Sequence, residues 1–562
     1  MEFSRSSHLM SQNIAEYSPI GGVYPGSGGT STIYVNTVPH TWHLSRIENL
    51  KTGSSVLFEY KNDGIEFYKT NQAWGHGQIS NQASTVMIYT NNHIGYSNPD
   101  EISTLYRLSA LSKVFTKKWS LSKIVFPNGV IIKFVSSLSN QLSTNESAWH
   151  SEGASFYLYE DLIKVDSYNT RNNLMQLDKI LISYKEVDQK EIKFDYTLSN
   201  SGRLQLRRIQ GKAGTDYHNL DSFSYNNMIT LPSYGSRMID HWGYFNNKDF
   251  FSSVGSPFSY SKMLNYSTFR EPESNTSSAE ILNRIIYPTG GYVDIEYEPH
   301  NYSITRGLGS IANLQSNENA GGVRIKALKK YAESGILSSE TKYEYKRDNS
   351  NLSSGVLAIP RPNYIELNNL NNDYFTFMSE GFNPTNYKGG NVTYSSVSII
   401  TDNNGKIIQK FTNYDNGFND LSPINSTSTQ FTAAFKNNML KRGRLLSLQN
   451  ISESSFLISK DSFFYEHDSN LLQPDQVRSL YLNGSSHASV IDDVFHDRIT
   501  GKQTINFNNE SSLVSQSSYS YESFGNIKEQ TIYTSKNEKI VKQFKYAHEY
   551  SSTGLDRESR GI

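Results

Sequence analysis

The residue types best suited to chemistry in this sequence are an acid and an imidazole that stand side by side, Asp240 and His241, followed by Trp242. A carboxylate next to an imidazole can serve acid–base catalysis. Adjacent residues on a strand, however, direct their side chains to opposite faces, so these two groups would not act on one substrate together. We therefore expect a structural corner with Trp242 buried, and we assign no catalytic residue.

Two further histidines, His40 and His43, flank Thr41 and Trp42. Binding one metal ion would require both imidazoles to converge on it. Residues three apart converge on a helix, but this segment has the pattern of a strand, on which they diverge. We therefore assign no metal site and no cofactor.

Carboxylate pairs offer the third possible chemistry, the acid and base of a glycosidase. The candidates are Asp294 with Glu296, and Glu333 with Glu340. Asp294 and Glu296 alternate with apolar residues, which is the pattern of a solvated strand face. The sequence also lacks a Gly-x-Ser-x-Gly elbow, a phosphate loop, an EF-hand and a His-Glu-x-x-His zinc sequence.

The elements that would position these residues are β-hairpins. The clearest spans residues 284–297 and places Pro288 and Gly290 between two alternating strands, and residues 123–134 and 46–60 repeat the pattern. Proline followed two residues later by glycine suits positions i+1 and i+3 of a type I turn. Beyond the turn, Val293, Ile295 and Tyr297 should share one face, with Asp294 and Glu296 on the other.

Strand ends carry a recurring aromatic signature, Phe or Tyr, any residue, then Tyr. It occurs at residues 58–60, 194–196, 223–225, 343–345, 519–521 and 544–546. Such residues favour strands and pair across neighbouring strands, so we expect aromatic ladders. Strand starts have a glycine, a basic residue within two positions and then Leu or Ile, as at 202–204, 322–325 and 443–445.

Composition limits the classes of function. The chain has 562 residues, 36% hydrophobic residues and a formal net charge of -1, with a mean hydropathy of -0.56. Interspersed charges without a basic stripe argue against a nucleic-acid partner. No apolar stretch reaches the 18 residues needed to span a bilayer. The absence of cysteine excludes disulfides, thiol nucleophiles and thiolate zinc sites.

The pattern along the chain predicts three regions. Residues 1–40 are rich in Ser and Gly and predict an irregular N-terminal segment, followed by hairpin-rich regions over 41–310 and 311–562. Leucines at near-helical spacing predict one helix over residues 103–117. The Asn-rich stretches 307–321 and 347–390 predict loops or a boundary.

Residues 521–527 and 544–546 resemble the tyrosine-aspartate (YD) repeat of Rhs-type proteins, in which each unit begins with Tyr-Asp-x-x-Gly-Arg/Asn-Leu and ends with Tyr-x-Tyr. Residues 414–417 and 196–204 resemble the same opening. Residues 240–246, 287–291 and 321–325, continued by 353–357, resemble the region that precedes an Rhs core in large bacterial surface proteins. Most units here lack the strict Tyr-Asp pair, and no core sequence or variable toxin tip follows.

The resemblance implies an all-β fold in which repeated hairpins form an extended, curved sheet or shell with few helices. It implies a non-enzymatic scaffold of a bacterial secreted or cell-surface protein that encloses or displays an effector, such as a C-terminal toxin, or that mediates contact. Two alternatives remain open: an extracellular glycan-binding or adhesion module, and a hydrolase acting on polysaccharides. No signal peptide is recognised, and we expect both ends to be cuts in a longer protein.

Overall fold

The structure is a computed structural model. It describes residues 2–15, 33–35, 38–49, 52–69, 74–78, 86–90, 93–94, 110–141, 156–158, 163–165, 174–233, 236–254, 260–307, 310–367, 374–381, 390–402, 404–420, 435–465, 476–483, 486–493, 498–508, 511–522, 525–536 and 538–546.

The chain is built from β-strands, as the sequence predicts. The strands before the helices are β1 Glu2–Ala15, β2 Ile33–Val35, β3 Val38–Glu48, β4 Ser55–Lys69, β5 Trp74–Gln78, β6 Val86–Thr90, β7 His93–Ile94, β8 Ala110–Val125, β9 Val130–Leu138, β10 Phe156–Leu158, β11 Ile163–Val165, β12 Met175–Tyr184, β13 Val187–Leu198, β14 Leu204–Ala213 and β15 Asp216–Tyr225. The helices described are short: α1 Phe250–Val254, α2 Tyr260–Leu264 and α3 Tyr266–Phe269.

Strands resume directly after the helices. They are β16 Leu282–Ile286, β17 Tyr292–Gly307, β18 Ser310–Tyr331, β19 Leu337–Glu344, β20 Gly355–Leu357, β21 Ile365–Leu367, β22 Tyr374–Met378, β23 Val392–Tyr394, β24 Ser396–Thr401, β25 Lys406–Phe411, β26 Phe435–Asn437, β27 Leu445–Ile451, β28 Leu457–Tyr465, β29 Gln476–Asn483, β30 Ser486–Asp493, β31 Ile499–Asn508, β32 Ser511–Tyr521, β33 Ile527–Tyr533 and β34 Lys539–Gln543.

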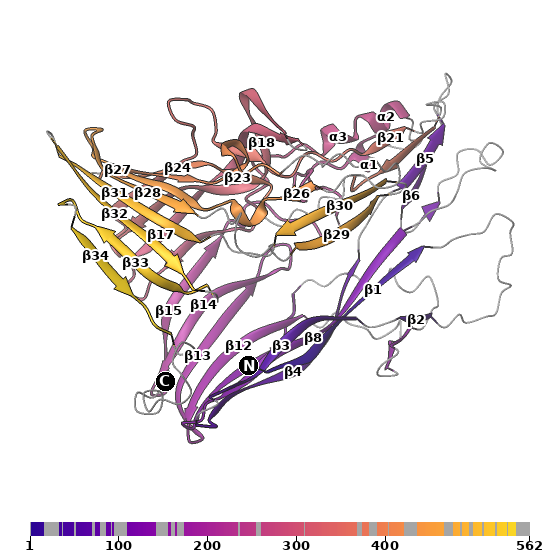
Figure 1. The fold of residues 1–562 in the computed structure, drawn as a ribbon. Coiled ribbons are helices and arrows are strands. Elements are labelled where there is room, and N and C mark those ends of the chain that lie inside the picture. The colour runs from indigo at the N-terminus through magenta and orange to yellow at the C-terminus, as the bar shows by residue number, and fades with distance from the viewer. Residues whose placement is uncertain are drawn as a thin grey trace.

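Most of these strands belong to one 23-stranded sheet. Strands adjacent in sequence pair antiparallel, for example β12 with β13, β13 with β14, and β31 with β32. Figure 1 shows this sheet as one strongly curved surface that runs from the indigo strands to the yellow ones. Smaller sheets form from β2, β10 and β11, from β5, β6, β7, β21 and β22, and from β26, β29 and β30.

The turn predicted from residues 284–297 is confirmed. Arg284 pairs with Asp294, and Ile286 pairs with Tyr292. The Gly290 N–H donates to the Tyr287 carbonyl over 3.0 Å, which closes the four-residue turn. Gly290 has φ +81, a conformation that costs glycine no steric strain, so glycine is required at this position. The turn at 126–129 repeats this bond, with Gly129 donating to Phe126 over 3.1 Å.

The final tyrosine of the aromatic signature has a specific role, and we call it the closing tyrosine. Tyr297 and Tyr465 occupy the equivalent position in their hairpins. The hydroxyl of a closing tyrosine donates to the carbonyl of a Leu or Ile in the first strand of its own hairpin. These bonds run from Tyr60 to Leu44 (2.9 Å), Tyr196 to Leu177 (2.8 Å), Tyr225 to Leu206 (2.9 Å), Tyr297 to Leu282 (2.8 Å), Tyr345 to Ile325 (2.7 Å), Tyr465 to Leu445 (3.0 Å), Tyr521 to Ile499 (2.6 Å) and Tyr546 to Ile527 (2.9 Å).

A β-bulge directs many closing tyrosines toward that carbonyl. The pairing with the following hairpin shifts register immediately before Tyr60, Tyr196, Tyr225, Tyr297, Tyr465 and Tyr521. A bulge bends its strand and increases the local twist. Because the shift recurs at the same point of successive hairpins, it contributes to the curvature of the whole sheet.

An arginine packs on each of three closing tyrosines. The guanidinium carbons of Arg324, Arg444 and Arg498 lie 4.1, 5.4 and 5.1 Å from the ring centroids of Tyr345, Tyr465 and Tyr521, respectively. In each case the arginine directly precedes the Leu or Ile whose carbonyl accepts the hydroxyl. In these three hairpins the arginine and the closing tyrosine therefore meet, and cation–π attraction adds to the hydrogen bond.

The short helices pack on an aromatic core. Phe250, Met263, Tyr266, Tyr364, Phe375 and Phe377 form this buried cluster. Tyr266 meets Phe250, Tyr364 and Phe377 edge to face at centroid distances of 5.0, 4.9 and 4.9 Å. This geometry suits the ring quadrupoles. The helical segment is thereby attached to β21 and β22 (Figure 1).

Several predictions about local structure are wrong. Residues 110–117, predicted as part of a helix, belong to β8, and residues 103–109 lie outside the described residues. β8 pairs with both β1 and β4, so tertiary pairing overrides the leucine spacing. Residues 1–40 contain β1, β2 and the start of β3, although we expected an irregular segment.

The Asn-rich segments also differ from expectation. Residues 310–321 form part of strand β18, not a loop. β17 and β18 pair from Tyr292–Tyr331 to Gly307–Ser310, so the sheet continues across the predicted boundary at residue 310. Residues 347–390 include the short strands β20, β21 and β22. Whether regions 41–310 and 311–562 fold separately stays a prediction.

Candidate functional site

Asp240 holds a tight turn together. Its side chain is completely buried, and its Oδ1 accepts the N–H groups of Trp242 (2.9 Å) and Tyr244 (3.0 Å). Burial raises the pKa of Asp240 to about 6, against the opposing effect of these hydrogen bonds and of Arg270. Because the carboxylate is directed into its own turn, Asp240 acts on the backbone and not on His241. The expected structural corner is present, although His241 and Trp242 lie in a turn and not on the strand that the sequence argument assumed.

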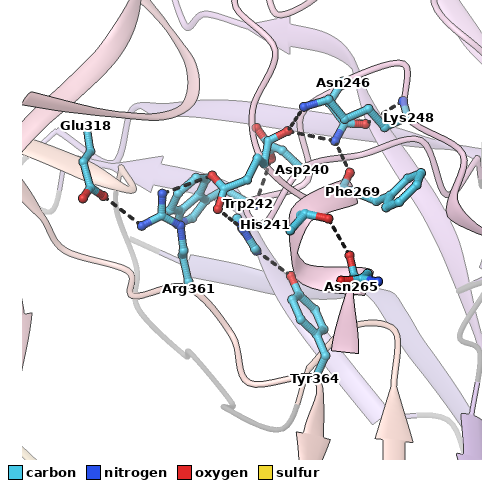
Figure 2. A network of polar contacts seen from close by, with 12 residues as sticks. Asp240, His241, Trp242, Asn246, Lys248, Asn265, Phe269, Glu318, Arg361 and Tyr364 are labelled. Atoms are coloured by element: carbon cyan, nitrogen blue, oxygen red, sulfur yellow. Dashed lines mark hydrogen bonds and ion pairs between the residues drawn. The ribbon is translucent and has the colours of Figure 1, made fainter. Parts of the chain in front are cut away.

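His241 connects two other segments. Its Nδ1 lies 2.8 Å from the Tyr364 hydroxyl, and its Nε2 lies 3.3 Å from Oε1 of Glu271. The residue is only 6% exposed, and burial lowers the pKa of its imidazole, although Glu271 opposes this shift. Both ring nitrogens are thus engaged, and Figure 2 shows the contact between His241 and Tyr364.

The network continues through a chain of charged groups. Arg361 contacts Glu271 over 3.1 Å and Glu318 over 3.0 Å, and Tyr302 donates to Glu318 over 2.7 Å (Figure 2 shows Glu318 and Arg361). Hydrogen bonds from Tyr302 and Arg361 lower the pKa of Glu318. Burial opposes ionisation of Glu271, but hydrogen bonds from His241 and Arg361 outweigh it and lower its pKa.

Hydrogen bonds near His241 also hold the backbone of residues 240–246, which we call the corner. Trp242 is partly buried, and its indole N–H donates to the Ile359 carbonyl over 2.8 Å. The Asn246 amide donates to the carbonyls of Phe269 (2.8 Å) and Glu271 (3.1 Å), and Figure 2 shows the bond to Phe269. Together with the charged chain, these bonds join the corner, the end of the helical segment, β17, β18 and the segment before β21.

Two glycines allow the corner to approach the sheet. A Cβ on Gly321 would collide with the Asp240 carboxylate and lie 2.8 Å from Cδ2 of Tyr244. Gly322 has φ +84, and a Cβ there would lie 2.8 Å from Cζ of Tyr244. The Gly-Gly pair at the strand-start signature is therefore required by close approach of the corner.

A second buried ionic cluster lies beside Tyr414, and sequence reasoning missed it. Asp420 contacts Arg306 and Arg442, each over 2.7 Å, and all three side chains are at most 8% exposed. The guanidinium carbons of Arg442 and Arg306 lie 3.9 and 5.2 Å from the Tyr414 ring centroid. The only sequence signal was the Tyr-Asp-Asn-Gly opening, whose Tyr414 begins a short 3-10 helix over Tyr414–Asn416.

Three of the candidate carboxylates, Asp294, Glu296 and Glu340, form ion pairs with basic side chains of the sheet. Asp294 contacts Arg284 over 2.5 Å, and Glu296 pairs with Lys329. Glu340 contacts Lys342 over 2.9 Å and Lys329 over 3.8 Å. Glu333 lies in the turn between β18 and β19. Cross-strand pairs of this kind contribute little stability each, and they match the charged strand face that the sequence predicts.

The histidine pair near the N-terminus gives no further assignment. Both residues belong to strand β3, as the sequence predicts. The His43 ring lies 4.7 Å from the Tyr60 ring, whereas the side chain of His40 lies outside the described residues. In the described part of the chain, no group of three or more His, Cys, Asp or Glu residues could hold a metal ion.

The described helices include none long and apolar enough to cross a membrane. No family model matches the sequence, and no curated protein matches it. Among solved structures, a chain of the Photorhabdus luminescens Tc holotoxin pore shows a weak likeness, with 9% sequence identity and a TM-score of 0.11. The match covers 88% of this chain but only 22% of the holotoxin chain. A likeness at this level carries no argument about function.

Proposed function

We propose that this chain is a non-catalytic β scaffold of a bacterial secreted or cell-surface protein that encloses or displays an effector. The observation that supports it is the succession of antiparallel hairpins in one curved sheet, in which a tyrosine at the equivalent position closes each of several units. Each hairpin hides the strand edge of its neighbour, so the surface can extend unit by unit. The resemblance to YD repeats supports the same role.

The arrangement of the ionisable groups favours a structural role. His241 has both ring nitrogens engaged inside the fold, and the Asp240 carboxylate serves its own turn. An acid–base catalyst must reach the proton it transfers in a bound substrate. Asp294 and Glu296 each hold a basic partner on the sheet surface. We therefore assign the network of Figure 2 to joining segments, not to turnover.

The test is protection of a neighbouring polypeptide. The chain is produced together with the polypeptide encoded directly after it, and the same polypeptide produced alone serves as the control. A scaffold that encloses its effector should copurify with it and slow its digestion by protease at least about tenfold, because cleavage follows the exposed fraction. Equal digestion rates without copurification would contradict the proposal.

A glycan-binding module is the second candidate, and one feature favours it. A groove of about 510 Å³ lies over β17, β18 and β19 and is lined mainly by polar side chains, with Tyr343 and Tyr345 among them. Tyrosine rings can pack on sugar faces, while Asn and Lys bond hydroxyl groups. A glycan array read with the folded chain, and with Tyr343→Ala as the groove variant, tests this candidate. Hits that the variant abolishes would support it, and an array without hits would remove it.

The polysaccharide hydrolase is tested with the same protein. Turnover of a polysaccharide panel should be absent from the unaltered chain. Turnover that disappears in Asp294→Asn or Glu296→Gln, with the fold retained, would refute the non-catalytic assignment.

A further inference from the structure

The last strand of the large sheet has one free edge. β34 pairs with β33 over Glu529–Gln543 to Tyr533–Lys539, and among the described residues no strand pairs with its other side. All five of its side chains are exposed. In Figure 1 it is the outermost yellow strand. An exposed edge of this kind can accept an additional strand.

The alternation of hydrogen-bonded and non-bonded residue pairs between β33 and β34 shows which backbone groups of β34 point away from β33. Phe544 donates its N–H to the Lys528 carbonyl over 2.9 Å, and Thr534 donates to Glu538 over 3.0 Å. Bonded and non-bonded pairs alternate along an antiparallel ladder. The residues that bond β33 are therefore the even-numbered ones, which leaves the N–H and C=O groups of Lys539, Val541 and Gln543 directed to the free edge.

The side chains at this edge are both basic and apolar. Residues 527–546 include the lysines 528, 536, 539, 542 and 545, against the glutamates 529 and 538. Within the part of the chain that the structure describes, no ion pair is formed by Lys536, Lys539 or Lys542. Ile540, Val541 and Phe544 are 47%, 43% and 40% exposed. The edge thus combines an excess of basic residues with apolar surface on both faces.

We propose that the free edge of β34 binds an extended, acidic segment of a partner polypeptide, which adds as a further strand. Outward backbone groups supply the ladder, as in β-strand addition, and the lysines select the partner by charge. Lysine on an edge also deters neutral or basic strands, so the same residues reject wrong partners. A second copy of this chain fits poorly, because it would bring two basic edges together. This inference does not depend on the scaffold proposal.

The test uses a labelled ten-residue peptide of alternating Glu and Val, with a Lys–Val peptide as the matched control, read by fluorescence anisotropy. The acidic peptide should bind saturably and lose affinity as salt is raised, while the basic peptide should not bind. Val541→Pro removes one outward N–H without breaking a bond to β33 and should weaken binding about three- to tenfold. Val541→Thr keeps the N–H and serves as the control.

A second variant and a second measurement keep the test decisive. Lys539→Glu combined with Lys542→Glu should exchange the preference, so that the basic peptide binds better. In the chain without peptide, the amides of Val541 and Gln543 should exchange hydrogen fast, and the amide of Phe544 slowly. Slow exchange of the first two, equal binding of both peptides, or concentration-dependent dimers that Val541→Pro abolishes would each overturn the proposal.

Discussion

Replacing Tyr345 with phenylalanine tests the role assigned to the closing tyrosines. The hydroxyl of Tyr345 donates to the Ile325 carbonyl over 2.7 Å, and its ring packs against the Arg324 guanidinium and the Tyr394 ring at 4.1 and 4.7 Å. Phenylalanine keeps both ring contacts and removes only the hydroxyl. The variant therefore isolates the hydrogen bond that closes the hairpin.

The expected loss follows from the burial of the bond. A neutral intramolecular hydrogen bond contributes about 1 kcal/mol net, and an acceptor left buried without a partner costs about 1–3 kcal/mol. The bond is partly buried, and this burial raises the pKa of Tyr345 to about 12. We expect Tyr345→Phe to lower the free energy of unfolding by about 1–2 kcal/mol.

The assay is urea unfolding followed by circular dichroism, with the midpoint compared at unchanged slope. Tyr343→Phe is the matched control, because Tyr343 lies in β19 two residues before Tyr345 and lines the same groove, and its hydroxyl has no described partner. Its expected effect is within about 0.5 kcal/mol. Equal effects of the two substitutions would refute the argument that the hydroxyl closes the hairpin.

The pH dependence gives an independent check on Tyr345. Its folded pKa of about 12 lies above the ordinary value of 10.0. The folded state therefore holds the proton more tightly, so this contribution to stability is present below pH 10 and is lost as pH rises through 12. The variant should lose less stability than the unaltered chain between pH 9 and pH 11, measured by urea unfolding.

The remaining predictions concern the two buried clusters. Asp240→Asn keeps the Oδ1 acceptor and removes a buried charge. The folded pKa of Asp240, about 6, exceeds the ordinary value of 3.8. The stability linked to this carboxyl is therefore present below pH 3.8 and is lost as pH rises through 6. The variant should therefore gain about 1–3 kcal/mol at pH 7 and nothing at pH 3.8, measured by urea unfolding; no gain at pH 7 would refute the buried carboxylate. Gly321→Ala should lower the melting temperature and cost about 1–3 kcal/mol by collision with the corner, whereas Gly211→Ala, whose Cβ would meet Leu220 at an ordinary 3.5 Å, should cost less than 1 kcal/mol. Asp420→Asn leaves two buried guanidinium groups without their carboxylate and should cost about 3–5 kcal/mol in the same urea assay; a loss below 1 kcal/mol would contradict the assigned cluster.

Sequence patterns predicted the hairpins because their causes are local. The turn at 287–290 requires proline to set φ and glycine to adopt a positive φ, and both requirements are visible in four residues. Alternation then fixes which side chains face the same way, so Arg284 and Asp294 meet across the strands. Asp240 and His241 act on different partners because of the turn that contains them. In this turn Asp240 bonds the turn backbone, whereas His241 contacts Tyr364 and Glu271.

Contacts between distant residues could not be predicted in this way. The leucine spacing of residues 103–117 favours a helix, but β8 is held as a strand by β1 on one side and β4 on the other. The Asn-rich residues 310–321 lack a strand pattern, yet they pair with β17. In both cases hydrogen bonds to a neighbouring strand outweigh local preference.

The sequence by itself determined the repeated strands, their turns and the aromatic residue that ends each hairpin, because propensity and period act over a few neighbouring residues. Tertiary structure decided what those residues do. A bulge directs Tyr521 to the carbonyl of Ile499, 22 residues earlier, and five distant segments converge on His241 and Arg361. Such partners are fixed by how hairpins stack, and stacking depends on the register and bend of the whole sheet.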